Sequence, residues 1–198
     1  DASRLDCVIM QMVRLVREGE TIKLSKRSGK AITLNTLIDE VPLDAARFFF
    51  NLREPNSHFD FDLELAAKQS SENPVYYVQY AHAICSIIKK AQEQGVELKT
   101  PSDDELALLS SKEEKDLIRH LSLLTDEIVS AAKSYDPAKI THYVIELATL
   151  FHKFYNAQRV MLDDNEGLMQ ARLFLCKAVK DTIYNILTML KITAPEVM

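Results

Sequence analysis

Glycine and long apolar runs are scarce in this chain. Only four glycines occur among 198 residues, 47% of which are apolar, and this composition indicates a well-packed, helix-rich globular protein. No apolar run approaches the roughly 20 residues of a membrane-spanning helix, so we expect no membrane association. The chain opens with Asp1 and carries early charges at Arg4 and Asp6, which does not fit a signal peptide. It also lacks an initiator methionine, which favours a piece of a longer protein.

Cysteine is scarce as well, with Cys7, Cys85 and Cys176 far apart along the sequence. An odd number at such spacing argues against a disulfide framework and against a zinc site, and it fits a reducing cytosol. Because free cysteines usually pack as small apolar residues, we predict three buried structural thiols and a cytoplasmic protein.

The excess of acidic residues bears on nucleic-acid binding. The net charge is −5, whereas a domain that binds nucleic acid indiscriminately is usually basic. Recognition of a nucleic acid would therefore need a local basic patch together with specific base contacts.

One segment does concentrate positive charge. Residues 22–30 read IKLSKRSGK, with four cations in eight residues and no acid among them. Lysine ammonium groups and serine hydroxyls beside a glycine suit a mobile loop that meets phosphate oxygens. A solvated surface cluster is the competing interpretation.

Apolar periodicity predicts helices along most of the chain. We expect an early helix over 1–19, a short strand from Thr21 to Leu24, a helix from Thr33 and one near 45–52 capped by Asp44. The later signals predict helices that begin at 73, 111, 136 and 166. Residues 58–62, HFDFD, alternate polar and aromatic and fit an extended stretch rather than a metal site. The result is a bundle of four or five main helices.

Five ordered segments carry a family resemblance. They are IKLSKRSGK at 22–30, DAARFFF at 44–50, SHFDFD at 57–62, ENPVYYVQYAHA at 72–83, and FHKFYN at 151–156 with the terminal APEVM. The first is similar to the KMSKS signature of class I aminoacyl-tRNA synthetases, with Leu24 in place of methionine. Together they resemble the bacterial type of arginyl-tRNA synthetase, from about residue 5 to the last residue.

The resemblance implies an all-α fold, namely a helical-bundle anticodon-binding domain over 73–198. Residues 1–72 would be the C-terminal part of a catalytic domain with the KMSKS-type loop. It further implies an enzyme that joins arginine to its tRNA with ATP and Mg²⁺, and that works as a cytoplasmic monomer.

The resemblance also assigns the basic loop. Lys23 and Lys26 would be catalytic, and with Ser25 and Lys30 they would contact the ATP phosphates, where cations stabilise the charge that develops on pyrophosphate. The chain has no HIGH motif and no pattern of a doubly wound sheet, so alone it should not make adenylate or hold a cofactor tightly.

Candidate tRNA contacts follow from the same resemblance, since bases of single-stranded loops stack on aromatic side chains. The candidates are Tyr77, Tyr80, His82, Tyr155, Asn156, Arg159 and Met198. Tyr77 and Tyr80 share a helix face, as do Tyr155 and Arg159. The competing interpretation is that these aromatics pack between helices, which we favour for Phe151 and Phe154.

The sequence also fits two other functions, and it departs from the family pattern at one position. The chain could belong to another class I synthetase (cysteinyl or methionyl), against which residues 73–83 argue, or be a protein-interaction bundle that does not discriminate between tRNAs. Asp44 and Arg47 could brace the tRNA or form structural contacts only.

The family usually carries an arginine between Ala83 and Ile84, and losing one helical residue rotates the rest by about 100°. The helix therefore contains a local irregularity, or the sequence has lost a residue.

Overall fold

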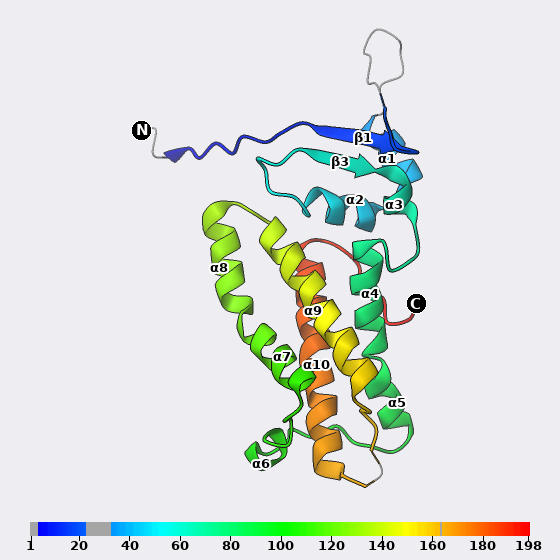
Figure 1. Ribbon diagram of the computed structural model, residues 1–198, viewed down its shortest axis with the longest axis vertical. Coiled ribbons are helices and arrows are strands. Elements are labelled where there is room, and N and C mark those ends of the chain that lie inside the picture. Colours follow the sequence, from blue (N-terminus) through cyan, green and yellow to red (C-terminus); the bar gives the residue numbers. More distant parts are fainter. Residues whose placement is uncertain (1–3, 23–32, 163) are drawn as a thin grey trace.

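The computed structural model describes residues 4–22, 33–162 and 164–198. A small sheet with short helices lies at one end, and a bundle of longer helices makes up the rest (Figure 1). The prediction of a mainly helical protein is confirmed, with the three-stranded sheet as an addition.

The sheet has the strand order β2-β1-β3. Strand β1 (Val13–Arg17) pairs antiparallel with β2 (Glu20–Thr21) and parallel with β3 (Phe59–Asp62). Arg14 Nε donates to Asp60 Oδ1 at 2.7 Å across the parallel pair. The extended stretch predicted around residues 58–62 is thus confirmed as a strand.

The helix predicted over 1–19 is wrong. Glu18 and Gly19 both have positive φ, 51° and 77°, which is the geometry of a two-residue hairpin turn. That turn joins β1 to β2, so the apolar residues before it follow a strand in which Leu15 faces the core. Leu5 and Ile9, expected on a buried helical stripe, are 73% and 81% exposed.

Three short helices accompany the sheet: α1 (Leu34–Glu40), α2 (Leu43–Phe50) and α3 (Leu63–Ala67). Thr33 caps α1 as predicted. Pro42, not Asp44, occupies the N-cap of α2, and Asp44 lies in its first turn. Phe49 of α2 packs on Phe61 of β3 with ring centroids 5.5 Å apart, which joins this helix to the sheet.

The bundle contains α4 (Pro74–Ile84), α5 (Ile87–Glu93), α6 (Asp103–Leu106), α7 (Lys112–Ser122), α8 (Leu124–Ser134), α9 (Ala138–Ala157) and α10 (Glu166–Met189). Helix α9 is the centre, because it packs against α4, α7, α8 and α10 (Figure 1). Its predicted apolar stripe is confirmed, since Val144, Leu147, Phe151 and Phe154 are fully buried.

Local capping signals decide where these helices begin. Asn73 caps α4 and is followed by proline, and Ser111 and Glu114 form a capping box on α7. Asp136 accepts a hydrogen bond from the Ala138 amide, while Pro137 holds the cap position of α9. Interruptions were less predictable: the single helix expected after Ser111 breaks at Leu123 into α7 and α8.

Two of the three cysteines behave as predicted. Cys85 and Cys176 are buried, and burial raises the pKa of the Cys176 thiol to about 12. Cys7 is exposed, so that part of the prediction is wrong. None of the helices in the described ranges combines the length and apolar character that crossing a membrane requires.

Candidate functional site

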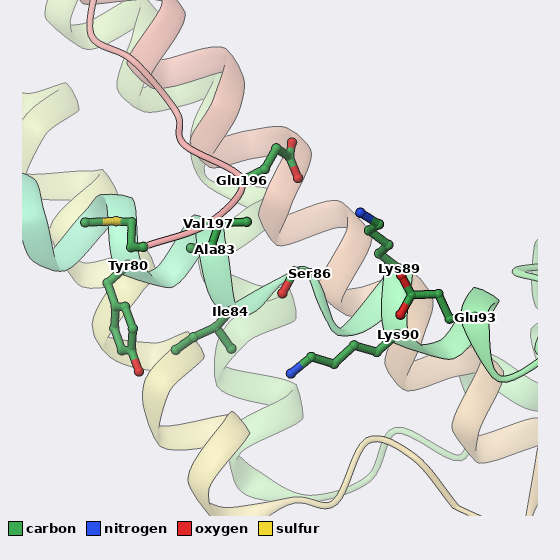
Figure 2. A pocket seen from close by; sticks show the side chains of 10 residues that line it. Tyr80, Ala83, Ile84, Ser86, Lys89, Lys90, Glu93, Glu196 and Val197 are labelled. Carbon is green, nitrogen blue, oxygen red and sulfur yellow. The ribbon is translucent and has the colours of Figure 1, made fainter.

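A groove of about 390 Å³ opens where α4 and α5 meet the C-terminal segment, residues 191–198 (Figure 2). Tyr80 and Ile84 of α4 and Met198 of the C-terminal segment contribute its larger side chains. Its volume falls within the roughly 300–1,000 Å³ of small-molecule sites. The groove therefore offers one aromatic face and an apolar wall that are open to solvent.

The groove depends on a break between α4 and α5. Helix α4 ends at Ile84 and α5 begins at Ile87, with a tight turn between them. The amides of Cys85 and Ser86 bond the carbonyls of His82 and Ala83, each three residues back. A local irregularity thus follows directly after the position where the family usually carries the additional arginine.

An aromatic stack supports Tyr80 from behind. The His152 ring of α9 lies 5.8 Å from the Tyr80 ring in a stacked arrangement and 4.6 Å from the Tyr77 ring. Burial lowers the pKa of His152, which favours the neutral ring. Tyr80 is 45% exposed, so one side of this stack is accessible.

Tyr155 lies one turn further along α9. Its half-buried ring packs 6.0 Å from that of Phe151, and burial raises its pKa. Phe151 and Phe154 are fully buried, as the packing interpretation predicted. Asn156 and Arg159 are exposed near the end of α9, where Asn156 lines a separate cavity beside Lys112 and Lys153. The structure therefore places these two polar candidates away from the groove of Tyr80.

His82 is a correction to the set of predicted contacts. It is only 1% exposed, and its Nδ1 donates to the carbonyl oxygen of Pro195 at 3.0 Å. Burial under the C-terminal segment leaves no surface for a direct contact with a base. His82 instead holds the segment that carries Met198 into the groove.

Other side chains fix the same segment, and sequence reasoning did not identify their partners in it. Asp44 Oδ2 accepts from the amide of Thr193 at 3.2 Å and from its hydroxyl, and Gln79 Nε2 donates to the Thr193 carbonyl at 2.9 Å. Arg47 donates to the Lys191 carbonyl. The structure thus gives Asp44 and Arg47 structural contacts. Partners 149 and 144 residues away leave no local signal in the sequence.

The basic loop cannot be placed in the same way. Lys23, Ser25, Lys26 and Lys30 lie outside the described residues. Across the described ranges, no group of three or more histidine, cysteine or acidic side chains could hold a metal ion. Any chemistry of the loop is therefore argued from its sequence alone.

Comparison with known proteins identifies the helical part. The DALR anticodon binding domain family matches residues 78–198, more than half of the chain. The chain belongs to this family. The DALR match begins inside α4, includes the groove and ends on Met198.

Relatives extend the similarity to the small sheet. An arginine–tRNA ligase of Caldanaerobacter subterraneus subsp. tengcongensis is 53% identical over 199 residues, 100% of this chain and 35% of the relative. That of Staphylococcus epidermidis is 49% identical, with the same coverage. The Thermus thermophilus arginyl-tRNA synthetase structure matches with a TM-score of 0.73 and 25% identity, over 93% of this chain and 34% of that one. The DALR chain thus spans about a third of the curated relatives' length.

Proposed function

We propose that this chain is the C-terminal part of an arginine–tRNA ligase and that its bundle binds the anticodon loop of an arginine tRNA. The observation that carries the proposal is the open Tyr80 groove inside a domain of the DALR family. The ligase relatives that match the whole chain support the choice of arginine.

The groove suits a base that has been splayed out of a single-stranded loop. An unstacked base could lie on the open side of Tyr80, which His152 and Tyr77 back. Stacking of this kind is sequence-tolerant and is worth about 1–3 kcal/mol per base. Met198 would close the groove over the ring.

Tyr155, Asn156 and Arg159 would serve neighbouring nucleotides. Asn156 can donate and accept hydrogen bonds to a base edge, and the Arg159 guanidinium can bond a phosphate bidentately. Their position at the end of α9 would let the loop extend from the groove along the bundle.

The basic loop would act in the complete enzyme. There, Lys23 and Lys26, with Ser25 and Lys30, would contact the phosphates of ATP, and Mg²⁺ would accompany the nucleotide. Cations preorganised around the leaving pyrophosphate stabilise the transition state of adenylate formation. The bundle would raise the rate at that distant site by positioning the tRNA. We propose a cytoplasmic monomer for the complete ligase.

The test is binding of the chain to arginine tRNA transcripts with the natural anticodon and with its middle base changed, at fixed salt. We expect changing that base to remove hydrogen bonds to its edge and to cost about 1–3 kcal/mol of binding free energy. Tyr80→Ala should weaken binding by a similar amount. Tyr135→Ala, which removes a tyrosine 55% exposed at the end of α8 outside the groove, should not.

Equal, weak binding to both transcripts would contradict anticodon recognition and favour a protein-interaction bundle. A preference for cysteine or methionine tRNA over arginine tRNA would favour another class I synthetase. The same assay therefore separates all three functions.

A further inference from the structure

Two lysines of α5 form the rim of the Tyr80 groove. Lys89 and Lys90 both line it, together with Ser86. Figure 2 shows their side chains extending in different directions, Lys90 toward the side of Ile84 and Lys89 toward the side of Glu196. No family feature described above assigns them a role.

The break between α4 and α5 brings Lys89 to the groove beside Lys90. In one uninterrupted helix Lys89 would lie nine residues, or about 180° around the axis, from Tyr80. The side chains of Tyr80 and Lys89 would then point to opposite faces of that helix. The turn at Cys85–Ser86 removes that constraint, and both residues line one groove.

The two lysines differ in their acidic neighbours. Glu196 bonds Lys180 Nζ at 2.6 Å, and this contact, with a smaller contribution from the charge of Lys89, lowers the pKa of Glu196. Lys89 therefore faces an acid on its side of the groove. Lys90 is exposed, and among the described residues no ion pair involves it. Lys89 is exposed too and no ion pair among the described residues involves it, so the two lysines differ in direction: Lys90 extends toward Ile84 and away from Glu196.

We propose that Lys90 contacts the backbone phosphate of a nucleotide whose base lies on Tyr80, and that Lys89 is a weaker second contact. This inference rests on the proposed function and deepens it. An aromatic face beside a cation matches a nucleotide, because the ring binds the base and the ammonium acts as a point charge on the phosphate. Phosphate contacts position a nucleic acid without reading its sequence. Lys90 and the Tyr80 stack would thus contribute affinity, while hydrogen bonds to base edges contribute base discrimination.

The experiment measures how the affinity of the whole chain for both arginine tRNA transcripts varies between about 50 and 200 mM salt. Removing one phosphate contact by Lys90→Gln should weaken binding to both transcripts equally and reduce the slope of log affinity against log salt by about 0.7–0.9. The ratio between the two transcripts should not change. Lys90→Arg, which keeps the charge, should retain the wild-type slope.

Lys133→Gln is the matched control. Lys133 is exposed on α8, outside the groove, and no ion pair among the described residues involves it. Removing Lys133 lowers the net charge by the same amount as Lys90→Gln. If net charge alone were the cause, the salt slopes of both variants would fall equally, and this result would overturn the inference.

Two further results would overturn it. If the wild type discriminates between transcripts but Lys90→Gln leaves the slope unchanged, the phosphate contact is wrong and the proposed function survives. If the wild type does not discriminate, the proposed function fails, and the inference fails with it.

Discussion

A buried ion pair lies beneath the surface that carries Asn156 and Arg159. Arg172 of α10 donates from Nε to Glu114 Oε1 at 2.8 Å, with side-chain exposures of 9% and 1%. The same guanidinium donates to the carbonyl of Arg159 and to the side chain of Gln158. Burial alone would raise the pKa of Glu114, but hydrogen bonds from Ser111 and Arg172 outweigh it and hold the pKa below its ordinary value. The pair therefore fixes the end of α9 to α7 and α10.

At the residue scale, we expect Arg172→Met to reduce the free energy of unfolding by about 3–5 kcal/mol, because it leaves a buried carboxylate unpaired. Urea denaturation followed by circular dichroism measures this. The double variant Arg172→Met with Glu114→Gln should recover part of the loss, since it removes the uncompensated charge. If the two variants were equally destabilised, packing rather than charge would be the cause.

The C-terminal segment is the element on which the groove depends. Helix α10 ends at Met189, well before Pro195, and Lys191 adopts a positive φ of 58° that redirects the chain. The segment then crosses α4, where polar contacts hold its first part. Its last two residues extend beyond those contacts, with Val197 84% and Met198 43% exposed.

Deleting Val197 and Met198 should therefore leave the fold intact while weakening RNA binding. We expect an unchanged melting temperature, because the two side chains bury little area. The affinity for the arginine tRNA transcript should fall by about 1–2 kcal/mol, as expected for losing the apolar cover of one base. Unchanged affinity with an unchanged melting temperature would exclude Met198 from the binding surface. Thr193→Val is a useful comparison, because it weakens the contacts that position the segment and leaves Met198 in place.

Sequence reasoning succeeded for the elements that short-range signals determine. Asn73 and Ser111 cap their helices through bonds to amides two or three residues away, so the pattern was sufficient. It failed for β1, whose longer pairing is with β3, 46 residues later, and whose apolar spacing also fits a helix. It assigned Asp44 to a cap for the same reason, because its partner Thr193 lies 149 residues away. The groove itself could not be predicted, since it requires the chain end to return to α4.

At the scale of the whole molecule, the core is continuous across the predicted boundary between 1–72 and 73–198. Helix α2 packs against α4, and residues from Leu15 to Ile192 belong to one cluster of buried apolar side chains. Thr141 of α9 also donates to the Asn51 carbonyl at 2.8 Å. The two regions thus stabilise each other, although the DALR match includes only the second.

Residues 73–198 made alone should consequently be less stable than the whole chain. We expect a decrease of about 2–4 kcal/mol in the free energy of unfolding, because α4 loses the cover of α2. Thermal and urea unfolding measure it. A chain that starts at Asp6 is the control: it keeps the Tyr135–Asp6 hydrogen bond and should match the whole chain. Equal stability of 73–198 and the whole chain would show that the boundary separates independent domains.

The contact between Asp44 and Thr193 has a consequence for the order of folding. Closing a loop of 149 residues is entropically costly, so this contact should form only after α4, α9 and α10 have brought the two regions together. On the ribosome, Asp44 emerges long before its partner is synthesised. The final closure of the groove therefore waits until residues 193–198 have been synthesised. Breaking the contact between Asp44 and Thr193 by mutation should speed unfolding more than it slows folding.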